Sequence, residues 1–163
     1  MPHITIEYMI MIPMLIMQIF LFPLTATLIM NTWVDSRRTL ALQDVAGHLS
    51  STMQQLYFSL NHVSIPVGKA SYAPGLPPLI EDYTYYANGT LRPVVGSGSD
   101  YTKIIDLKVS MNGTKNSATV AVILGPNVVW QSSIFQSNSP RASVTAEKTM
   151  NGSAATITLR FDS

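Results

Sequence analysis

The chain has 163 residues, which is enough for one ordinary domain but not for two well-packed domains and a long helix. Apolar residues make up 47% of it and charged residues only 12%, a composition that disfavours a free cytosolic monomer. With 10 Lys and Arg against 9 Asp and Glu, the chain has no basic surplus for binding nucleic acid. It contains no cysteine, which excludes disulfides, thiolate metal sites and cysteine nucleophiles.

The first segment, residues 4–30, is apolar and carries a single charge, Glu7. A helix needs about 20 apolar residues to cross a bilayer, so this length suffices. Only His3 precedes it as a weakly basic residue, and no small-residue cleavage pattern follows it, so we expect a retained hydrophobic helix. Pro13 and Pro23 each remove a backbone donor and are expected to bend or loosen this helix.

The helix is expected to continue beyond residue 30. Apolar residues recur at spacings of three and four, which forms one helical stripe: Leu42, Val45, Leu49, Met53, Leu56 and Leu60. A continuous helix over residues 4–60 would be about 85 Å long at about 1.5 Å per residue. We therefore assign residues 1–62 to a long N-terminal helix and residues 63–80, rich in Pro and Gly, to a linker.

The remaining segment, residues 81–163, has the period of two that is typical of strands buried on one face. The alternating apolar positions are Ile105, Leu107, Val109 and Met111; Val120, Val122 and Leu124; and Ala155, Ile157, Leu159 and Phe161. Asn88-Gly89, Asn112-Gly113 and Asn151-Gly152 predict three hairpin turns, because Asn-Gly accommodates positive φ. About seven strands at this spacing predict an α+β chain whose C-terminal domain is an antiparallel, immunoglobulin-like β-sandwich.

The start Ile4-Thr5-Ile6-Glu7-Tyr8, followed by the long apolar run and a C-terminal β-domain, resembles the archaeal type IV pilin-like family, and TadE-like pilus proteins begin similarly. Counting from His3 places the acidic residue fifth, as is usual in that family. The resemblance implies a membrane-embedded precursor, cleaved by a prepilin peptidase and assembled by pilus machinery. It also implies an extracellular helical homopolymer with the N-terminal helices in its core and the β-domains outside, serving adhesion or, in archaellins, motility.

Glu7 is the residue that this resemblance makes most informative. A carboxylate in an apolar run costs about 2.5–3.5 kcal/mol at mid-bilayer, so it needs a partner. One interpretation pairs it with the α-amino group of a neighbouring subunit, which would set the axial register. The other leaves it in the first helical turn, favoured by the helix dipole and close to lipid headgroups. The residues expected to mediate assembly are Ile4, Ile6, Glu7, Tyr8, Met14, Phe20 and Phe22.

A membrane-anchored binding or stator module that does not polymerise is the alternative. The stripe from Leu42 to Leu60 argues against it, because the stripe continues well past a bilayer and needs a cover, from the β-domain or from neighbouring helices. Arg37 and Arg38 argue for it, since the positive-inside rule would hold that end of the span in the cytoplasm.

Three triplets match the acceptor pattern for N-linked glycans, at Asn88, Asn112 and Asn151. In a domain rich in Asn, Ser and Thr such triplets also arise by chance, and each of the three is also expected to form a hairpin turn. Sugars would supply a hydrophilic surface to a domain with few charges.

Catalytic sites are not indicated by the sequence. His3, His48 and His62 are scattered without metal-ligand spacing, and the acidic residues do not fit a calcium loop. The loop Gly96–Asp100 lacks the strand-to-helix setting of a phosphate-binding loop. We expect a structural protein with no catalytic residues, no metal and no cofactor other than N-linked glycans.

Overall fold

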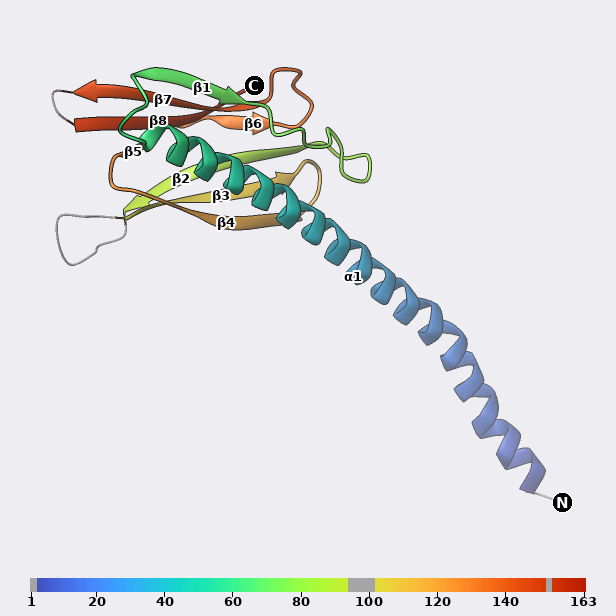
Figure 1. The fold of residues 1–163 in the computed structure, drawn as a ribbon. Helices are drawn as coiled ribbons and strands as arrows, with labels where there is room; N and C mark the ends of the chain where they lie inside the picture. The colour runs from blue at the N-terminus through green and yellow to red at the C-terminus, as the bar shows by residue number, and fades with distance from the viewer. Residues whose placement is uncertain (1–2, 94–101, 152–153) are drawn as a thin grey trace. The chain divides into compact units, whose positions relative to one another are not determined.

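The computed structural model describes residues 3–93, 102–151 and 154–163, and side chains within these ranges except those of residues 3–7 and Pro93. These residues form one helix and eight strands, so the α+β class is confirmed (Figure 1). The elements are α1 (His3–Asn61), β1 (Gly68–Tyr72), β2 (Tyr85–Pro93), β3 (Lys103–Met111), β4 (Ser117–Leu124), β5 (Val128–Trp130), β6 (Ile134–Gln136), β7 (Ser143–Asn151) and β8 (Ala154–Asp162). The chain divides into two compact units, residues 1–37 and 38–163.

The strands of the second unit form two four-stranded sheets. One has the order β1-β7-β8-β5 and the other β4-β3-β2-β6. All pairs are antiparallel except β5 and β8, which are parallel. The chain crosses from the second sheet to the first between β4 and β5, and it returns to the second sheet with β6. The sheets approach each other where β5 lies beside β2 and β6 beside β8.

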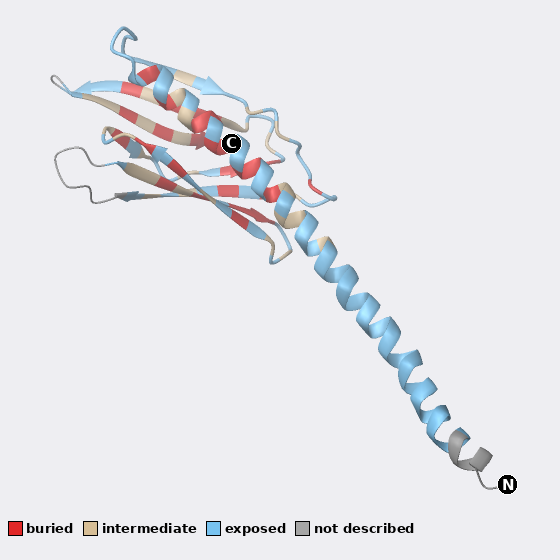
Figure 2. Cartoon of the chain, turned by 60° about the horizontal axis from the view of Figure 1, so that its bottom comes forward, coloured by how far each residue is buried: buried red, intermediate tan, exposed pale blue. Residues whose placement is uncertain are grey.

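The C-terminal part of α1, residues 38–61, packs on both sheets. Its buried residues and the buried residues of the strands form one core cluster, and Figure 2 shows the buried positions of both in red. The buried helical positions are Leu42, Val45, Ala46, Leu49, Met53, Tyr57 and Leu60. The helical stripe is thus confirmed, with one change: Leu56 is half-buried, and Tyr57, which the three-and-four spacing omitted, is almost fully buried.

The predicted alternation is confirmed for strands β3, β4 and β8. Ile105, Leu107 and Val109 are fully buried on β3, as are Ile157 and Leu159 on β8. On β4, Val122 and Leu124 are buried and Val120 is half-buried. These positions face the core because successive strand residues point to opposite faces of a sheet.

The prediction of a turn at Asn88-Gly89 is wrong. Both residues lie inside β2 and pair with Lys108 and Leu107 of β3. Asn-Gly permits a turn without requiring one, and here the glycine serves close packing. A Cβ on Gly89 would lie 2.8 Å from the ring of Trp130, so only glycine fits without a shift.

The other two Asn-Gly pairs stand where strands connect. Asn112 and Gly113 follow β3, and Gly113 has a φ of 74°, the positive value that the turn requires. Strand β7 ends at Asn151 and pairs with β8 from Ala154; Gly152 lies outside the described residues.

The segment expected as a linker, residues 63–80, includes a strand. Strand β1 lies within it and pairs with β7 in register from Gly68–Lys148 to Tyr72–Val144. Its five residues, Gly-Lys-Ala-Ser-Tyr, are mostly exposed and lack the apolar alternation by which strands are recognised.

Candidate assembly surface

The N-terminal part of α1 carries the candidate functional surface. Every residue from Tyr8 to Trp33 is exposed in the single chain (Figure 2). This is the one segment of the described residues that is long and apolar enough to cross a membrane. Full burial of one large apolar side chain stabilises by about 1.5–3 kcal/mol, so leaving this whole segment in water is strongly unfavourable.

The expected assembly residues are displayed on this surface. The exposed fractions are 62% for Tyr8, 63% for Met14, 73% for Phe20 and 75% for Phe22. At 3.6 residues per turn, the last three point in different directions around the helix axis. The segment is therefore apolar on all sides, a pattern typical of helices surrounded by lipid or by several other helices.

Ile4, Ile6 and Glu7 are helical in backbone, but their side chains lie outside the described part. The pairing of Glu7 with a neighbouring α-amino group therefore stays a prediction.

The hydroxyl groups of this segment turn back onto the helix. The Oγ1 atoms of Thr27 and Thr32 each donate to the carbonyl oxygen four residues earlier, Pro23 and Leu28, at 2.8 Å. Thr25 Oγ1 lies within donating distance of two carbonyls one turn earlier. Because these polar groups are satisfied within the helix, the threonines present mainly their methyl groups outward.

Pro13 and Pro23 lie inside α1 without ending it. The carbonyl four residues before each proline receives no helical N–H, since proline has none to donate. A shallow apolar hollow lies beside the second proline, lined by Leu15, Gln18, Ile19, Leu21, Phe22, Pro23 and Thr25.

Within the second unit, the helix is fixed to the sheets by specific polar contacts at its C-terminal end. Lys148 of β7 is only 4% exposed, and its Nζ donates to the carbonyl oxygens of His62 at 2.9 Å and Ile65 at 2.8 Å. An ammonium group at this position complements the negative end of the helix dipole.

Asn127, between β4 and β5, makes the second contact. Its Oδ1 accepts from Tyr57 Oη at 2.6 Å, and its Nδ2 donates to Asn61 Oδ1 at 2.9 Å and to the carbonyl of Ala155 at 3.2 Å. Burial raises the pKa of Tyr57, and a backbone hydrogen bond from Gly125 partly opposes this. The phenol is thus a neutral donor at physiological pH.

The start of the second unit has its own contact. Arg38 Nε lies 2.8 Å from Glu81 Oε2, and its guanidinium stacks 5.1 Å from the ring centre of Tyr83. Glu81 and Asp82 have φ values of 47° and 66°, so they form a tight turn that two backbone bonds between Ile80 and Tyr83 close. Sequence reasoning missed this turn, because neither residue is a glycine or an asparagine.

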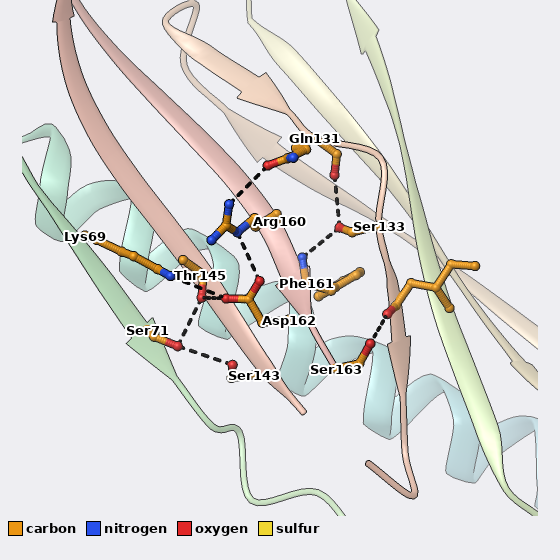
Figure 3. Close-up of polar contacts among 11 residues, drawn as sticks. Lys69, Ser71, Gln131, Ser133, Ser143, Thr145, Arg160, Phe161, Asp162 and Ser163 are labelled. Atoms are coloured by element: carbon orange, nitrogen blue, oxygen red, sulfur yellow. Dashed lines mark hydrogen bonds and ion pairs between the residues drawn. The ribbon is translucent and has the colours of Figure 1, made fainter. Parts of the chain in front are cut away.

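A polar cluster on the outer face of the first sheet ties edge strand β1 to its neighbours (Figure 3). Thr145 Oγ1 donates to Asp162 Oδ2 at 2.7 Å, and Lys69 and Arg160 lie 3.7 and 3.0 Å from the same carboxylate. The hydrogen bond from Thr145, followed by the two cations, holds the pKa of Asp162 below its usual 3.8, although burial opposes them. Every charge in this cluster has a partner, so it stabilises the sheet and offers no reactive group.

Metal-binding groups are not found among the described residues: no cluster of three or more His, Asp or Glu side chains occurs there. His48 lies 3.9 Å from Asp44 on the exposed side of α1, and His62 Nδ1 lies 2.6 Å from Ser64 Oγ.

The three sequons occupy different settings. Asn88 is exposed within β2, and Asn112 is exposed in the β3–β4 turn, where its Nδ2 donates to Thr84 Oγ1 at 2.7 Å. Asn151 is exposed at the end of β7. Asn88 was predicted to lie at the tip of a hairpin, but it lies within strand β2.

Comparisons with known proteins return no relative for this chain: no family model matches it, and neither a curated protein nor a solved structure does.

Proposed function

We propose that this chain is the repeating structural subunit of an extracellular, adhesive filament of the archaeal type IV pilus kind. The N-terminal helices of many copies would form the filament core, and the β-domains would cover it. The observation that carries this proposal is the segment from Tyr8 to Trp33, which is apolar on all sides and exposed along its whole length.

The length of that segment suits both the membrane-embedded precursor and the assembled filament. Its 26 residues extend about 39 Å at about 1.5 Å per residue, against a bilayer core of about 30 Å. The same surface could therefore be covered first by lipid and later by sister helices. Its methionines, which are unbranched and adaptable, suit the irregular gaps between packed helices.

The β-domain limits the part of α1 that neighbouring copies of the chain could cover. The apolar stripe from Leu42 to Leu60 is covered by the chain's own sheets, so no neighbour is needed there. The segment before residue 34 remains as the surface that other copies would cover. For the domain itself we propose an immunoglobulin-like sandwich, supported by two four-stranded sheets that share one core.

The partners proposed with this function are copies of the same chain, the cytoplasmic membrane before assembly, a prepilin peptidase and pilus assembly machinery. Catalysis, a metal and nucleic acid have no part in it.

A second candidate, a membrane-anchored β-domain that does not polymerise, is favoured by the residues at the end of the span. Trp33 is 53% exposed, and the guanidinium of Arg37 stacks 4.9 Å from the centre of its ring. Aromatic and basic residues commonly mark a membrane–water interface. The internal cover of the Leu42–Leu60 stripe also removes the need for neighbours there.

Cysteine cross-linking distinguishes the two candidates, since the chain has no cysteine of its own. Phe22→Cys places one thiol on the apolar surface, and His48→Cys places one on the exposed side of the helix beyond it. For a filament, oxidation of sheared surface material yields more disulfide-linked dimers with Phe22→Cys than with His48→Cys, since one thiol per chain can join two chains, and electron microscopy shows regular filaments. Recovery of the chain only as a monomer in detergent-solubilised membrane would refute the filament and support the anchor.

The role of Glu7 is tested separately. Glu7→Gln removes the charge while keeping the shape of the side chain, so filament yield is expected to fall strongly if an α-amino group pairs with the carboxylate. Circular dichroism of the variant checks that the β-domain remains folded. An unchanged filament yield would contradict the pairing of Glu7 with an α-amino group and would favour a hydrated carboxylate near the lipid headgroups.

A further inference from the structure

The Asn88 sequon lies on the sheet β4-β3-β2-β6, and its asparagine and threonine are on the outer face of that sheet. Gly89 faces inward, where a Cβ would meet Trp130 and Ile105. Because neighbouring strand residues point to opposite faces, Asn88 and Thr90 both point outward, and both are exposed. Both functional groups of this sequon, the amide and the hydroxyl, therefore face solvent from a rigid strand.

Among the described residues, the Asn112 sequon lacks this combination. Asn112 Nδ2 donates to Thr84 Oγ1 at 2.7 Å, and the hydroxyl of its partner Thr114 accepts from the backbone N–H of Asn116 at 3.2 Å. The remainder of the Asn151 sequon lies outside the described residues. By contrast, the part of the chain that the structure describes provides no hydrogen-bond partner for the side chains of Asn88 and Thr90.

The surroundings of Asn88 fit a sugar ring. Tyr86 lies two residues earlier on the same face, about 7 Å away along the strand, and is 37% exposed. Ile134 is the direct cross-strand neighbour on β6 and is 51% exposed, and Lys108 is the neighbour on β3. A pyranose has a C–H face that packs on apolar groups and on the negative face of an aromatic ring, and its hydroxyls can accept from an ammonium group.

We propose that Asn88 is an N-glycosylation site whose first sugar packs on Tyr86 and Ile134. The proposal rests on the export that the proposed function requires. In the transfer, Asn88 Nδ2 forms a bond to the anomeric carbon of a lipid-linked glycosyl phosphate, and the bond from that carbon to the phosphate oxygen breaks. The leaving phosphate takes the electron pair, and one Nδ2 proton passes to a base of the transferase.

Tryptic peptides of the protein from its native cells test the modification. The three sequons fall into separate peptides, residues 70–103, 109–115 and 149–160. Peptide 70–103 is expected to carry added sugar mass, which Thr90→Ala abolishes while Asn88 remains. Thr114→Ala is the matched control, because it removes the Asn112 sequon and leaves the mass on peptide 70–103. An unmodified peptide 70–103 overturns the proposal, whatever the other two peptides carry.

A thermal double-mutant cycle tests the packing of the sugar. The melting temperature of the full chain is compared with that of Thr90→Ala, and the same difference is measured in a Tyr86→Ser background. The glycosylated chain is expected to melt higher, and this difference shrinks in Tyr86→Ser but persists in the control Tyr72→Ser, an exposed tyrosine on β1. An equal difference in all three backgrounds would refute the role of Tyr86.

Failure of this inference is distinguishable from failure of the proposed function. Filaments with an unmodified Asn88 overturn the glycan alone. A modified Asn88 on a chain that stays monomeric in detergent overturns the filament alone.

Discussion

Lys148 provides a sharp test of how the helix is held on the sheets. Lys148→Met keeps the aliphatic stem and removes the ammonium group that donates to the carbonyls of His62 and Ile65. The residue is 4% exposed, so water replaces the lost donor poorly. We expect the C-terminal end of α1 to be less firmly attached and the domain to unfold at lower temperature.

The magnitude follows from the two bonds. A hydrogen bond from a charged group contributes about 1.5–3 kcal/mol. The carbonyl of His62 keeps a second donor, the backbone N–H of Ile65 at 3.2 Å, and methionine avoids the desolvation cost of the ammonium group. The expected net loss is therefore near that of one bond, about 2 kcal/mol, or about 4–8 °C in melting temperature for a chain of this size.

Thermal unfolding of the full chain in detergent micelles, followed by far-ultraviolet circular dichroism, measures this loss. Lys115→Met is the matched control, because Lys115 is exposed in the β3–β4 turn and its replacement should change stability by less than about 0.5 kcal/mol. If both variants melt together, the ammonium group does not stabilise the helix end and the reasoning fails.

Two further predictions concern the domain. Gly89→Ala should destabilise the domain by about 1–3 kcal/mol, since the added Cβ overlaps the indole ring of Trp130. Gly47→Ala has open space around it on the helix and should stabilise by about 0.5–1 kcal/mol. Denaturant titration measures both changes in unfolding free energy, and changes of the same sign would contradict the packing argument. The hydrogen bond from Thr145 to Asp162 lowers the folded pKa of that carboxyl, so its stabilisation is present above the unfolded pKa near 3.8 and is lost as pH falls through the lowered value. Asp162→Asn should therefore lose less stability than the parent chain between about pH 6 and pH 3, and parallel pH profiles would count against it.

The sequence predicted the elements whose periodicity is strong. Residues such as Leu49 and Met53 repeat with the helical period, and Leu107 and Leu159 alternate with polar neighbours, so the helix and strands β3, β4 and β8 could be assigned. The sequence also indicated the apolar segment before residue 34, because its composition alone makes burial necessary.

Elements without a periodic signal were not predictable. Strand β1 carries exposed side chains and owes its existence to pairing with β7. The turn at Glu81 and Asp82 puts positive φ on two residues that are neither glycine nor asparagine, and its Glu81 pairs with Arg38, which is 43 residues earlier. Neither depends on a local preference that a short window of sequence could reveal.

Asn88-Gly89 separates the two kinds of information most clearly. By itself the sequence determined that the pair tolerates a turn and that Asn88 matches a sequon. Only the tertiary structure decided that Gly89 lies under Trp130 within a strand and that Asn88 points outward beside Tyr86. The physical reason is that local chemistry fixes which backbone angles a residue can adopt, while the choice among them depends on packing with residues far away in the chain.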